Sequence, residues 1–271
     1  MARPLIVLKF GGSVLRDEDD LLRAVKETES WVDRGWNVVA VVSAFEGVTD
    51  TLVGRAKHFG DGPLAEAQAL LTATGELQSA SLLTLALHRA GVPSTVGSPW
   101  TIMLRAEGAP LDAFPRSINA AAVRVLFEEV RALVVPGFIG IDELKRLVLL
   151  GRGGSDLSAI FVAQQLAAAK CRLVKDVDGL YEWDPADFSA PGAGASGAGA
   201  GGKGQPRRYA SLSWLGALAL DGGIVQHKPV RFAREHRLRF EVGGYGSSAP
   251  TIVGDVPESF SDSCSLVAGA V

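Results

Sequence analysis

The sequence predicts an α/β fold in which a mainly parallel central sheet is sandwiched by helices. Short runs of Val, Ile and Leu recur along the chain, and longer segments with helical spacing of apolar residues lie between most of them. Strands that are apolar throughout are typical of parallel sheets buried on both faces, and the intervening helices supply the covering layers. At 271 residues the chain is long enough to bury a full hydrophobic core.

Six apolar runs are the expected strands, because each is short and rich in Val, Ile or Leu. The first is LIVLKF at residues 5–10, close to the start of the chain. The others lie at 37–43, 132–139, 146–150, 172–175 and 239–242.

Five longer segments are the expected helices, because apolar residues recur in them three or four positions apart. They lie at 18–34, 63–90, 117–130, 156–168 and 211–221. In open parallel sheets, ligands bind outside the carboxyl ends of the strands. The loops that follow the strands are therefore where a functional site is expected.

Composition and charge exclude several classes of partner. The net charge is −3, and the lysines and arginines are scattered rather than clustered, so we expect no nucleic acid and no membrane surface as partners. Cys171 and Cys264 are too far apart for a metal-ligand pair, and the four histidines lack metal spacing, so we expect no metal site built by the chain. No stretch has the length of a signal or membrane segment, and we expect a cytoplasmic protein.

The segment SAPGAGASGAGAGGKG at residues 189–204 consists almost entirely of Gly, Ala and Ser. Such a composition lacks the apolar side chains that offset the entropy of ordering, so we expect a mobile surface insertion. A domain linker is the alternative. Strand and helix patterns of the same kind resume after it, which favours an insertion within one domain.

The first expected strand ends in a glycine-rich loop. Lys9 is followed closely by Gly11, Gly12 and Ser13. Glycines after a strand let backbone N–H groups approach a phosphate, and a lysine adds a positive charge beside it. A simple turn is the alternative interpretation.

A second glycine loop follows the strand at 146–150 and begins a helix. It reads Gly151-Arg152-Gly153-Gly154-Ser155-Asp156. The helix start offers unpaired N–H groups, and Arg152 offers a planar fork for a carboxylate or phosphate. In the alternative interpretation the loop is only a tight connection, capped by Ser155 or Asp156. If the two glycine loops face one another, they surround a highly charged group.

Three further segments carry candidate residues. Ser43 to Asp50 follows a strand, where Ser43 could contact a substrate and Thr49 or Asp50 could cap the next helix. Gly75, next to Glu76, is unfavourable inside a helix, which indicates a kink or a ligand close to the backbone. The turn from Asp176 to Tyr181 follows the strand at 172–175, and its aromatic ring could hold a purine or simply pack.

Together these segments resemble the aspartokinases of the amino acid kinase superfamily. The matching segments are VLKFGGSVL, VVSAFEGVTD, TATGELQSASLL, VVPGFIG, LGRGGSD and VKDVDGLYEWDP, and they follow one another in that family's order. A weaker similarity continues through LGALALDGGIVQH and FAREHRLRFEV to a last strand near Thr251. The resemblance implies the amino acid kinase fold, also called carbamate kinase-like, and transfer of the γ-phosphoryl of ATP to the side-chain carboxylate of L-aspartate.

The resemblance also implies a role for each matching residue. Lys9 and Asp156 would be catalytic, with Lys9 stabilising the transferring phosphoryl. The phosphate-binding residues would be Gly11, Gly12, Ser13, Gly153 and Gly154. The residues that hold the amino acid would be Ser43, Thr49, Glu76, Phe138, Arg152 and Ser155, with Arg152 on a carboxylate and Phe138 as a wall. The nucleotide-binding residues would be Lys175, Asp176 and Tyr181, and Mg²⁺ would bridge the phosphates of ATP.

The chain departs from the family pattern at three places. Val148 and Leu149 replace two threonines, Ala186 replaces an arginine after Asp184-Pro185, and His227-Lys228-Pro229 replaces His-Pro-Arg. These changes leave two alternatives open: a related kinase with another amino acid or carboxylate as acceptor, and a catalytically weak paralogue that binds nucleotide or amino acid. Arg207 and Arg208 could supply the missing nucleotide-side arginine, although a solvated pair is the simpler interpretation.

The resemblance further implies a homodimer built on the kinase domain. We expect the catalytic domain to span residues 1–254, followed by a tail at 255–271. Typical aspartokinases continue into paired ACT regulatory domains, and no such domain is expected within these residues. We therefore expect that lysine and threonine do not inhibit the purified chain.

Overall fold

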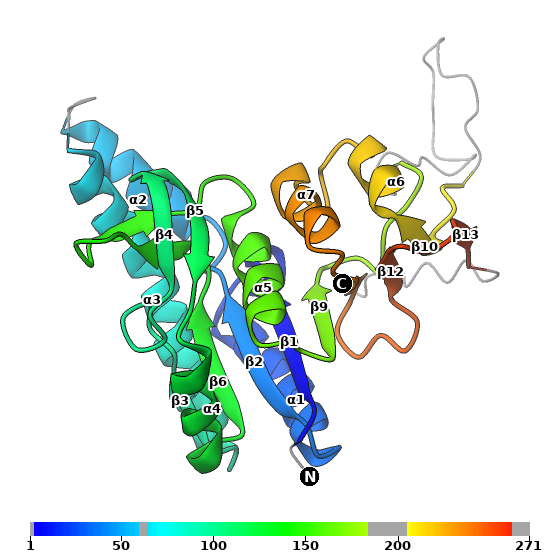
Figure 1. The fold of residues 1–271 in the computed structure, drawn as a ribbon, viewed down its shortest axis with the longest axis horizontal. Coiled ribbons are helices and arrows are strands. Elements are labelled where there is room, and N and C mark those ends of the chain that lie inside the picture. The colour runs from blue at the N-terminus through cyan, green and yellow to red at the C-terminus, as the bar shows by residue number, and fades with distance from the viewer. Residues whose placement is uncertain (1–2, 60–63, 184–204, 262–271) are drawn as a thin grey trace.

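The computed structural model describes residues 3–59, 64–183 and 205–261. The glycine-rich segment 189–204, the departure at Ala186 and Cys264 all lie outside the described residues. Within the described residues, a large sheet has the strand order β13-β10-β12-β11-β9-β1-β2-β6-β3 (Figure 1). Its strands are β1 (Leu5–Phe10), β2 (Asn37–Val42), β3 (Ser94–Val96), β6 (Ala132–Pro136), β9 (Lys170–Val174), β10 (Tyr209–Ser213), β11 (Phe240–Gly243), β12 (Thr251–Gly254) and β13 (Ser259–Phe260).

The centre of this sheet is parallel. β1 pairs in parallel with β2 and with β9, and β2 pairs in parallel with β6. The antiparallel pairs join β11 to β12 and β10 to β13, toward one edge. The mainly parallel α/β fold expected from the sequence is thus confirmed. Because β13 pairs with β10, the sheet continues beyond residue 254, where the sequence pattern placed the end of the domain.

Helices cover both faces of the sheet (Figure 1). They are α1 (Glu18–Asp33), α2 (Val48–His58), α3 (Ala65–Arg89), α4 (Ala120–Glu129), α5 (Gly154–Gln165), α6 (Trp214–Ala219) and α7 (His227–Glu235), with a 3₁₀ turn η1 (Gly12–Val14). Successive residues of β1 and β2 point to opposite faces. Val7 and Val41 are therefore buried in the core under α5, whereas Ile6 and Leu8 are buried in the core under α1 and α3.

A second sheet of order β5-β4-β7-β8 lies beside the first and was not predicted. Its strands are β4 (Arg105–Ala109), β5 (Asp112–Ser117), β7 (Ile139–Ile141) and β8 (Leu147–Leu149). The single strand expected at 132–139 is wrong, because the chain breaks between β6 and β7. Phe138 has a φ of 66° at this break, which ends the first strand and turns the chain into the second sheet.

Other expected boundaries are also wrong. The segment 117–130 begins with the end of β5, and α4 starts only at Ala120, where the Asn119 side chain caps it. The segment 211–221 begins within β10, and α6 is capped by Ser213. Helix α7 and strands β3 and β4 were not among the expected elements.

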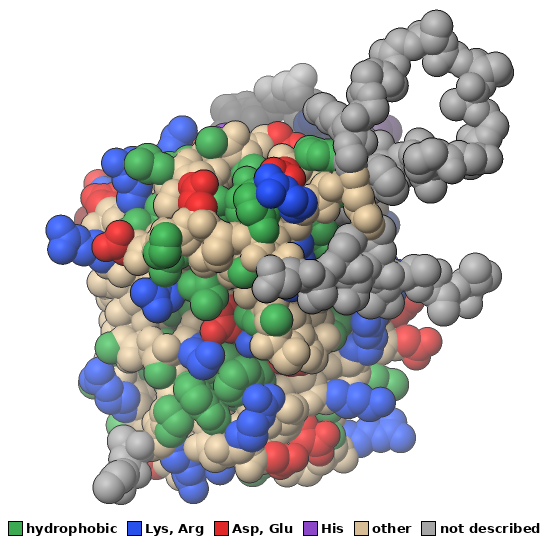
Figure 2. Space-filling view, turned by 90° about the vertical axis from the view of Figure 1, so that its right-hand side faces the viewer, with side chains coloured by type: hydrophobic (Ala, Val, Ile, Leu, Met, Phe, Trp, Pro, Cys, Tyr) green, Lys and Arg blue, Asp and Glu red, His purple; other side chains and the backbone are tan. Residues whose placement is uncertain are grey.

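Acidic and basic side chains are interspersed on the face shown in Figure 2, and hydrophobic side chains gather in its lower half. None of the helices in the described parts of the chain combines the length and the apolar character that a bilayer-spanning segment needs.

Candidate active site

The register of the central strands brings three loops to one edge of the sheet. Phe10 of β1 pairs with Val42 of β2 on one side and with Val174 of β9 on the other. Because the three strands are parallel and end level, Gly11, Ser43 and Lys175 all follow at the same edge. This is the carboxyl edge, where parallel sheets bind their ligands.

A cavity of about 580 Å³ opens at this edge. Residues of both glycine loops line it, which confirms that the loops face a common space. The predicted site residues that line it are Lys9, Gly12, Ser13, Ser43, Thr49, Glu76, Phe138, Arg152, Gly153, Gly154, Ser155 and Asp156. Gly11 is not part of the lining, but a Cβ there would lie 2.7 Å from the Lys9 Nζ atom, so a larger residue would require the lysine ammonium group to shift.

Two lysines and one aspartate form a buried ion cluster at the floor of the cavity. Lys9 Nζ lies 2.7 Å from Asp156 Oδ1, and Lys175 Nζ lies 2.9 Å from Asp156 Oδ2. The side chains of Lys9 and Asp156 are only 7% and 6% exposed, so water screens this cluster poorly. The two positive charges and the one negative charge leave a net positive charge at the end of β1.

Burial and charge act differently on the members of this cluster. Burial lowers the pKa of Lys9 to about 8, although the nearby Asp156 carboxylate opposes that change. Burial would raise the pKa of Asp156, but the charges of Lys175 and Lys9 outweigh it and hold the pKa at about 2. At neutral pH the lysine is therefore largely protonated and the aspartate is ionised.

The second glycine loop is shaped by left-handed backbone. Gly153 has a φ of 75° and is the N-cap of α5, so the capping by Ser155 or Asp156 in the alternative interpretation is wrong. A Cβ on Gly153 would lie 2.7 Å from Cβ of Gln226, so the backbone is closely packed as well. The N–H of Gly154 donates to the carbonyl oxygen of Gly151 at 2.9 Å, but no side chain caps the helix, so the N–H groups that follow in the first turn of α5 are not held by a cap.

Glu76 reaches the cavity from α3 and is nearly fully buried. Its Oε1 atom accepts a hydrogen bond of 3.3 Å from the N–H of Ala44, whereas its Oε2 atom has no hydrogen-bond partner among the described residues. Burial raises the pKa of this carboxyl to about 7. An unpartnered buried oxygen costs free energy, so a cation that entered the cavity would be stabilised here.

Gly75 lies where another part of the chain packs closely against α3. α3 runs through this position as one helix, and a Cβ on Gly75 would lie 2.9 Å from Cβ of Ala44. The close neighbour of Gly75 is therefore protein, and the glycine lets the loop after β2 approach α3. Thr49 and Asp50 lie inside α2, whose N-cap is Gly47, so the expected capping by these two side chains is wrong.

The residues expected on the nucleotide side lie apart from the cavity lining. Lys175 does not line the cavity, but its Nζ atom donates to Asp156, which does. Asp176 Oδ1 accepts a hydrogen bond of 3.1 Å from the hydroxyl of Ser13, another lining residue. Tyr181 forms a β-bridge with Arg208. Arg208 itself donates to the carbonyl oxygens of Ala249 and Asp178, whereas Arg207 pairs with Glu182 at 2.7 Å.

Several residues of the site were missed by sequence reasoning. Gln68 and Leu111 line the main cavity, and Lys228 lines an adjoining hollow of about 420 Å³ that shares Arg152 with it. Lys228 Nζ donates to the carbonyl oxygen of Leu150 at 2.6 Å and to Asp112 at 2.7 Å, and so holds the start of the second glycine loop. The only indication of Lys228 in the sequence was that it lies where the chain departs from the family's His-Pro-Arg motif.

Two glycine-lined turns around a buried positive cluster, at the carboxyl edge of a parallel sheet, are typical of α/β proteins that bind a phosphorylated ligand. Comparison with known families shows which class of phosphate-binding protein this is. Residues 4–191 match the model of the amino acid kinase family. The chain belongs to this family.

Its relatives include enzymes named for aspartate. The chain is 33% identical over 241 residues to the aspartate kinase of Pseudomonas putida strain KT2440. The aligned region covers 88% of this chain and 55% of that protein. It is 30% identical over 241 residues to aspartokinase 2 of Bacillus subtilis strain 168, with the same coverage of 88% and 55%. The chain thus spans about half the length of these relatives.

Solved structures share the fold. Escherichia coli aspartokinase III in complex with aspartate and ADP is 21% identical, with a TM-score of 0.74 over 94% of this chain and 65% of that one. The aspartate kinase of Synechocystis is 26% identical, with a TM-score of 0.74 over 97% and 41% of the two chains. The UMP kinase of Bacillus anthracis is 17% identical, with a TM-score of 0.62 over 96% and 100%.

Proposed function

We propose that the protein transfers the γ-phosphoryl group of ATP to the side-chain carboxylate of L-aspartate, giving 4-phospho-L-aspartate. The observation that carries this proposal is the buried cluster of Lys9, Asp156 and Lys175, which lies between two glycine loops and beside a cavity that also contains Glu76 and Arg152. The kinship with aspartate kinases supports ATP as the donor and aspartate as the acceptor.

Phosphoryl transfer requires mainly positioning and stabilisation of negative charge. In the proposed reaction Lys9 contacts the transferring phosphoryl group, and Gly11, Gly12 and Ser13 surround it on the side of β1. Gly153 and Gly154 approach it from the side of α5. Asp156 orients Lys9 and Lys175, because each of its oxygens lies within hydrogen-bond distance of one lysine.

The acceptor binds at the opposite end of the cavity. Arg152 is exposed at the rim, where its guanidinium pairs with the α-carboxylate of the amino acid. The unpartnered Oε2 atom of Glu76 accepts a hydrogen bond from the ammonium group. Ser43, Thr49 and Ser155 supply hydroxyl groups around the amino acid.

The attacking oxygen is that of the side-chain carboxylate of aspartate. It attacks the γ-phosphorus of ATP, the bond to the β-γ bridging oxygen breaks, and ADP leaves. Because a carboxylate is already ionised at neutral pH, no general base is needed. The ionised state of Asp156 is therefore used for charge and orientation.

Magnesium enters this proposal together with ATP. Asp156 already faces two lysines, and Asp176 accepts a hydrogen bond from Ser13, so both of these carboxylates already have partners within the protein. Mg²⁺ is commonly held by substrate phosphates with one or two protein carboxylates. The donor set fits a Mg²⁺ ion held chiefly by the phosphates, which offsets their charge.

Trapping of the acyl phosphate with hydroxylamine tests the acceptor. The purified chain is incubated with Mg-ATP and either L-aspartate, L-glutamate, N-acetyl-L-glutamate or succinate. Hydroxamate from aspartate, in excess over the other acids, is the expected result. Leu149 lines the cavity where the family motif has threonine, and this favours another carboxylic acid as the second candidate. Product only with another acid would move the acceptor assignment, and no product with any acid would contradict kinase activity.

A further inference from the structure

The loop of residues 244–250 connects β11 to β12 and lies between two parts of the proposed site. On one side it meets the nucleotide-side loop that follows β9. Just before the loop, the Lys175 N–H donates to the carbonyl oxygen of Gly243, the last residue of β11, at 2.9 Å. A Cβ on Gly244 would lie 3.8 Å from the carbonyl oxygens of both Lys175 and Val177. This end of the loop therefore packs directly on the backbone that follows β9.

On its other side the loop contacts the first glycine loop through Tyr245. The Tyr245 hydroxyl donates a hydrogen bond of 2.9 Å to the carbonyl oxygen of Val14, the last residue of η1. η1 also contains Gly12 and Ser13. The tyrosine ring stacks on Phe10, the last residue of β1, with ring centroids 5.8 Å apart. Burial raises the pKa of Tyr245, so its hydroxyl remains a donor at neutral pH.

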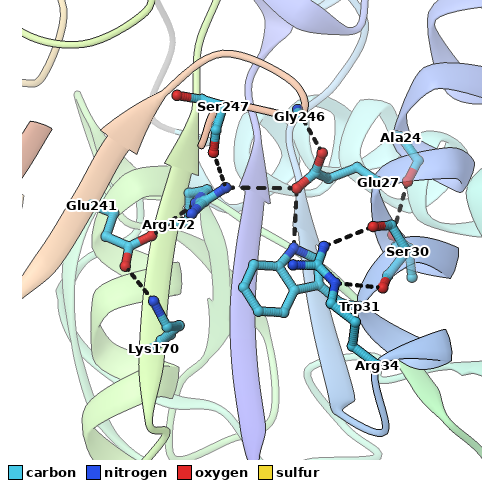
Figure 3. Close-up of polar contacts among 11 residues, drawn as sticks. Ala24, Glu27, Ser30, Trp31, Arg34, Lys170, Arg172, Glu241, Gly246 and Ser247 are labelled. Atoms are coloured by element: carbon cyan, nitrogen blue, oxygen red, sulfur yellow. Dashed lines mark hydrogen bonds and ion pairs between the residues drawn. The ribbon is translucent and has the colours of Figure 1, made fainter. Parts of the chain in front are cut away.

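A buried network keeps this loop in place (Figure 3). The N–H of Gly246 donates to Oε2 of Glu27 at 2.8 Å, and Arg172 donates to the carbonyl oxygen of Ser247 at 3.1 Å. Glu27 and Arg172 are 7% and 6% exposed, and they come from α1 and β9. Glu241 of β11 fixes Arg172 in turn, with a contact of 2.7 Å.

These contacts tie the loop to both sides of the phosphate site. We infer that the 244–250 loop sets the position of η1 relative to the nucleotide-side loop, and that Tyr245 is the positioning residue that acts on it. The inference rests on the proposed function, because it assigns a consequence to nucleotide binding. Without the Tyr245 hydroxyl, the Val14 carbonyl loses its partner from the loop, and the donors of Gly12 and Ser13 become less well placed for a phosphate.

The test compares Tyr245→Phe with Trp100→Phe. Tyr245→Phe keeps the ring that stacks on Phe10 and removes only the hydroxyl. Trp100→Phe is the matched control, because it also removes one side-chain donor to a backbone carbonyl, that of Lys145, and Trp100 does not line the cavity. Two quantities are measured for each variant: amide hydrogen exchange of the peptide covering residues 11–15 without ligand, and the Kd for Mg-ATP.

The expected result is faster exchange of that peptide in Tyr245→Phe, and a Kd for Mg-ATP raised about fivefold, the scale of one lost hydrogen bond. The KM of the acceptor stays that of the wild type, and Trp100→Phe changes neither quantity. Unchanged exchange overturns the inference, and so does faster exchange with an unchanged Kd, because the contact would then be structural only. A wild type that does not bind Mg-ATP overturns the proposed function itself, and this inference with it.

Discussion

Glu76 is a buried carboxylate whose protonation should affect both stability and binding. Its pKa is raised from 4.5 to about 7, so the folded protein binds this proton more tightly than the unfolded chain. Stability from this proton is complete below pH 4.5 and is lost as the pH rises through about 7. The shift corresponds to about 3 kcal/mol of the free energy of unfolding.

Glu76→Gln removes this dependence. We expect the wild type to lose roughly 2 to 3 kcal/mol more than the variant between about pH 5 and pH 8, measured by urea unfolding. The variant keeps the size of the side chain, so differences in packing cancel in the comparison. Parallel stability profiles for the two proteins would show that Glu76 does not titrate in this range.

Substitution of Arg152 should affect binding of the acceptor and leave binding of the nucleotide nearly unchanged. Its guanidinium lies at the rim of the cavity, so Arg152→Ala should raise the KM of the acceptor about 10- to 100-fold, as expected for a lost charge-assisted hydrogen-bonded pair. The Kd for Mg-ATP should change little. Arg55→Ala is a suitable control, since Arg55 is an exposed arginine of α2 that does not line the cavity. An equal loss of nucleotide affinity would place Arg152 on the phosphates instead.

For single residues, the sequence predicted which residues belong to the candidate site better than it predicted the contacts between them. The glycine loops were recognisable because close backbone approach requires glycine, and they do line one cavity. The ion pairs that Asp156 forms with both lysines could not be predicted, because the three residues come from different elements and meet only when β1, β9 and α5 pack together. Lys228 was noticed only as a departure from the family motif, and its contact with the carbonyl oxygen of Leu150 could not be predicted because the two residues are far apart in the sequence.

Two helices provide a matched test of packing. Gly54 lies in α2 with open space around it, whereas a Cβ on Gly75 in α3 would lie 2.9 Å from Ala44 and 3.2 Å from Val48. Gly54→Ala should stabilise the protein by about 0.5 to 1 kcal/mol, because alanine restricts the unfolded chain and favours a helix. Gly75→Ala should destabilise it by about 1 to 2 kcal/mol, because the overpacking outweighs that gain.

Urea unfolding of the two glycine variants measures both effects. The signs of the two changes matter more than their sizes. If Gly75→Ala were as stable as Gly54→Ala, the close approach of α3 to the loop after β2 would be wrong.

Among the elements, those that carry a continuous apolar pattern were predictable, and those that depend on distant partners were not. β1, β2 and β9 are buried on both faces and follow the expected runs closely. β4 and β5 mix exposed and buried positions and contain Gly108 and Pro115, so their sequences lack a strand signal. α6 follows β10 without a break, and a helix-like spacing of apolar residues concealed the strand.

For the whole molecule, we propose that one edge of the sheet binds both the phosphoryl donor and the acceptor, with Lys9 between them. β1 lies at the centre of the large sheet, between β2 and β9, so its end adjoins the loops of both neighbours. Lys9 is at that end and faces the cavity. We therefore expect its removal to slow the proposed transfer step.

The most direct measurement is the rate of hydroxamate formation by the wild type and by Lys9→Ala, with saturating Mg-ATP and L-aspartate. Asp156 keeps Lys175 as a partner in the variant, so its carboxylate does not become an unpaired buried charge. A thermal melt of each protein shows whether the variant is folded. We predict hydroxamate with the wild type and a rate about 100- to 1,000-fold lower with folded Lys9→Ala. An undiminished rate in Lys9→Ala would contradict the proposed role of Lys9, and no hydroxamate from the wild type would contradict the proposed reaction.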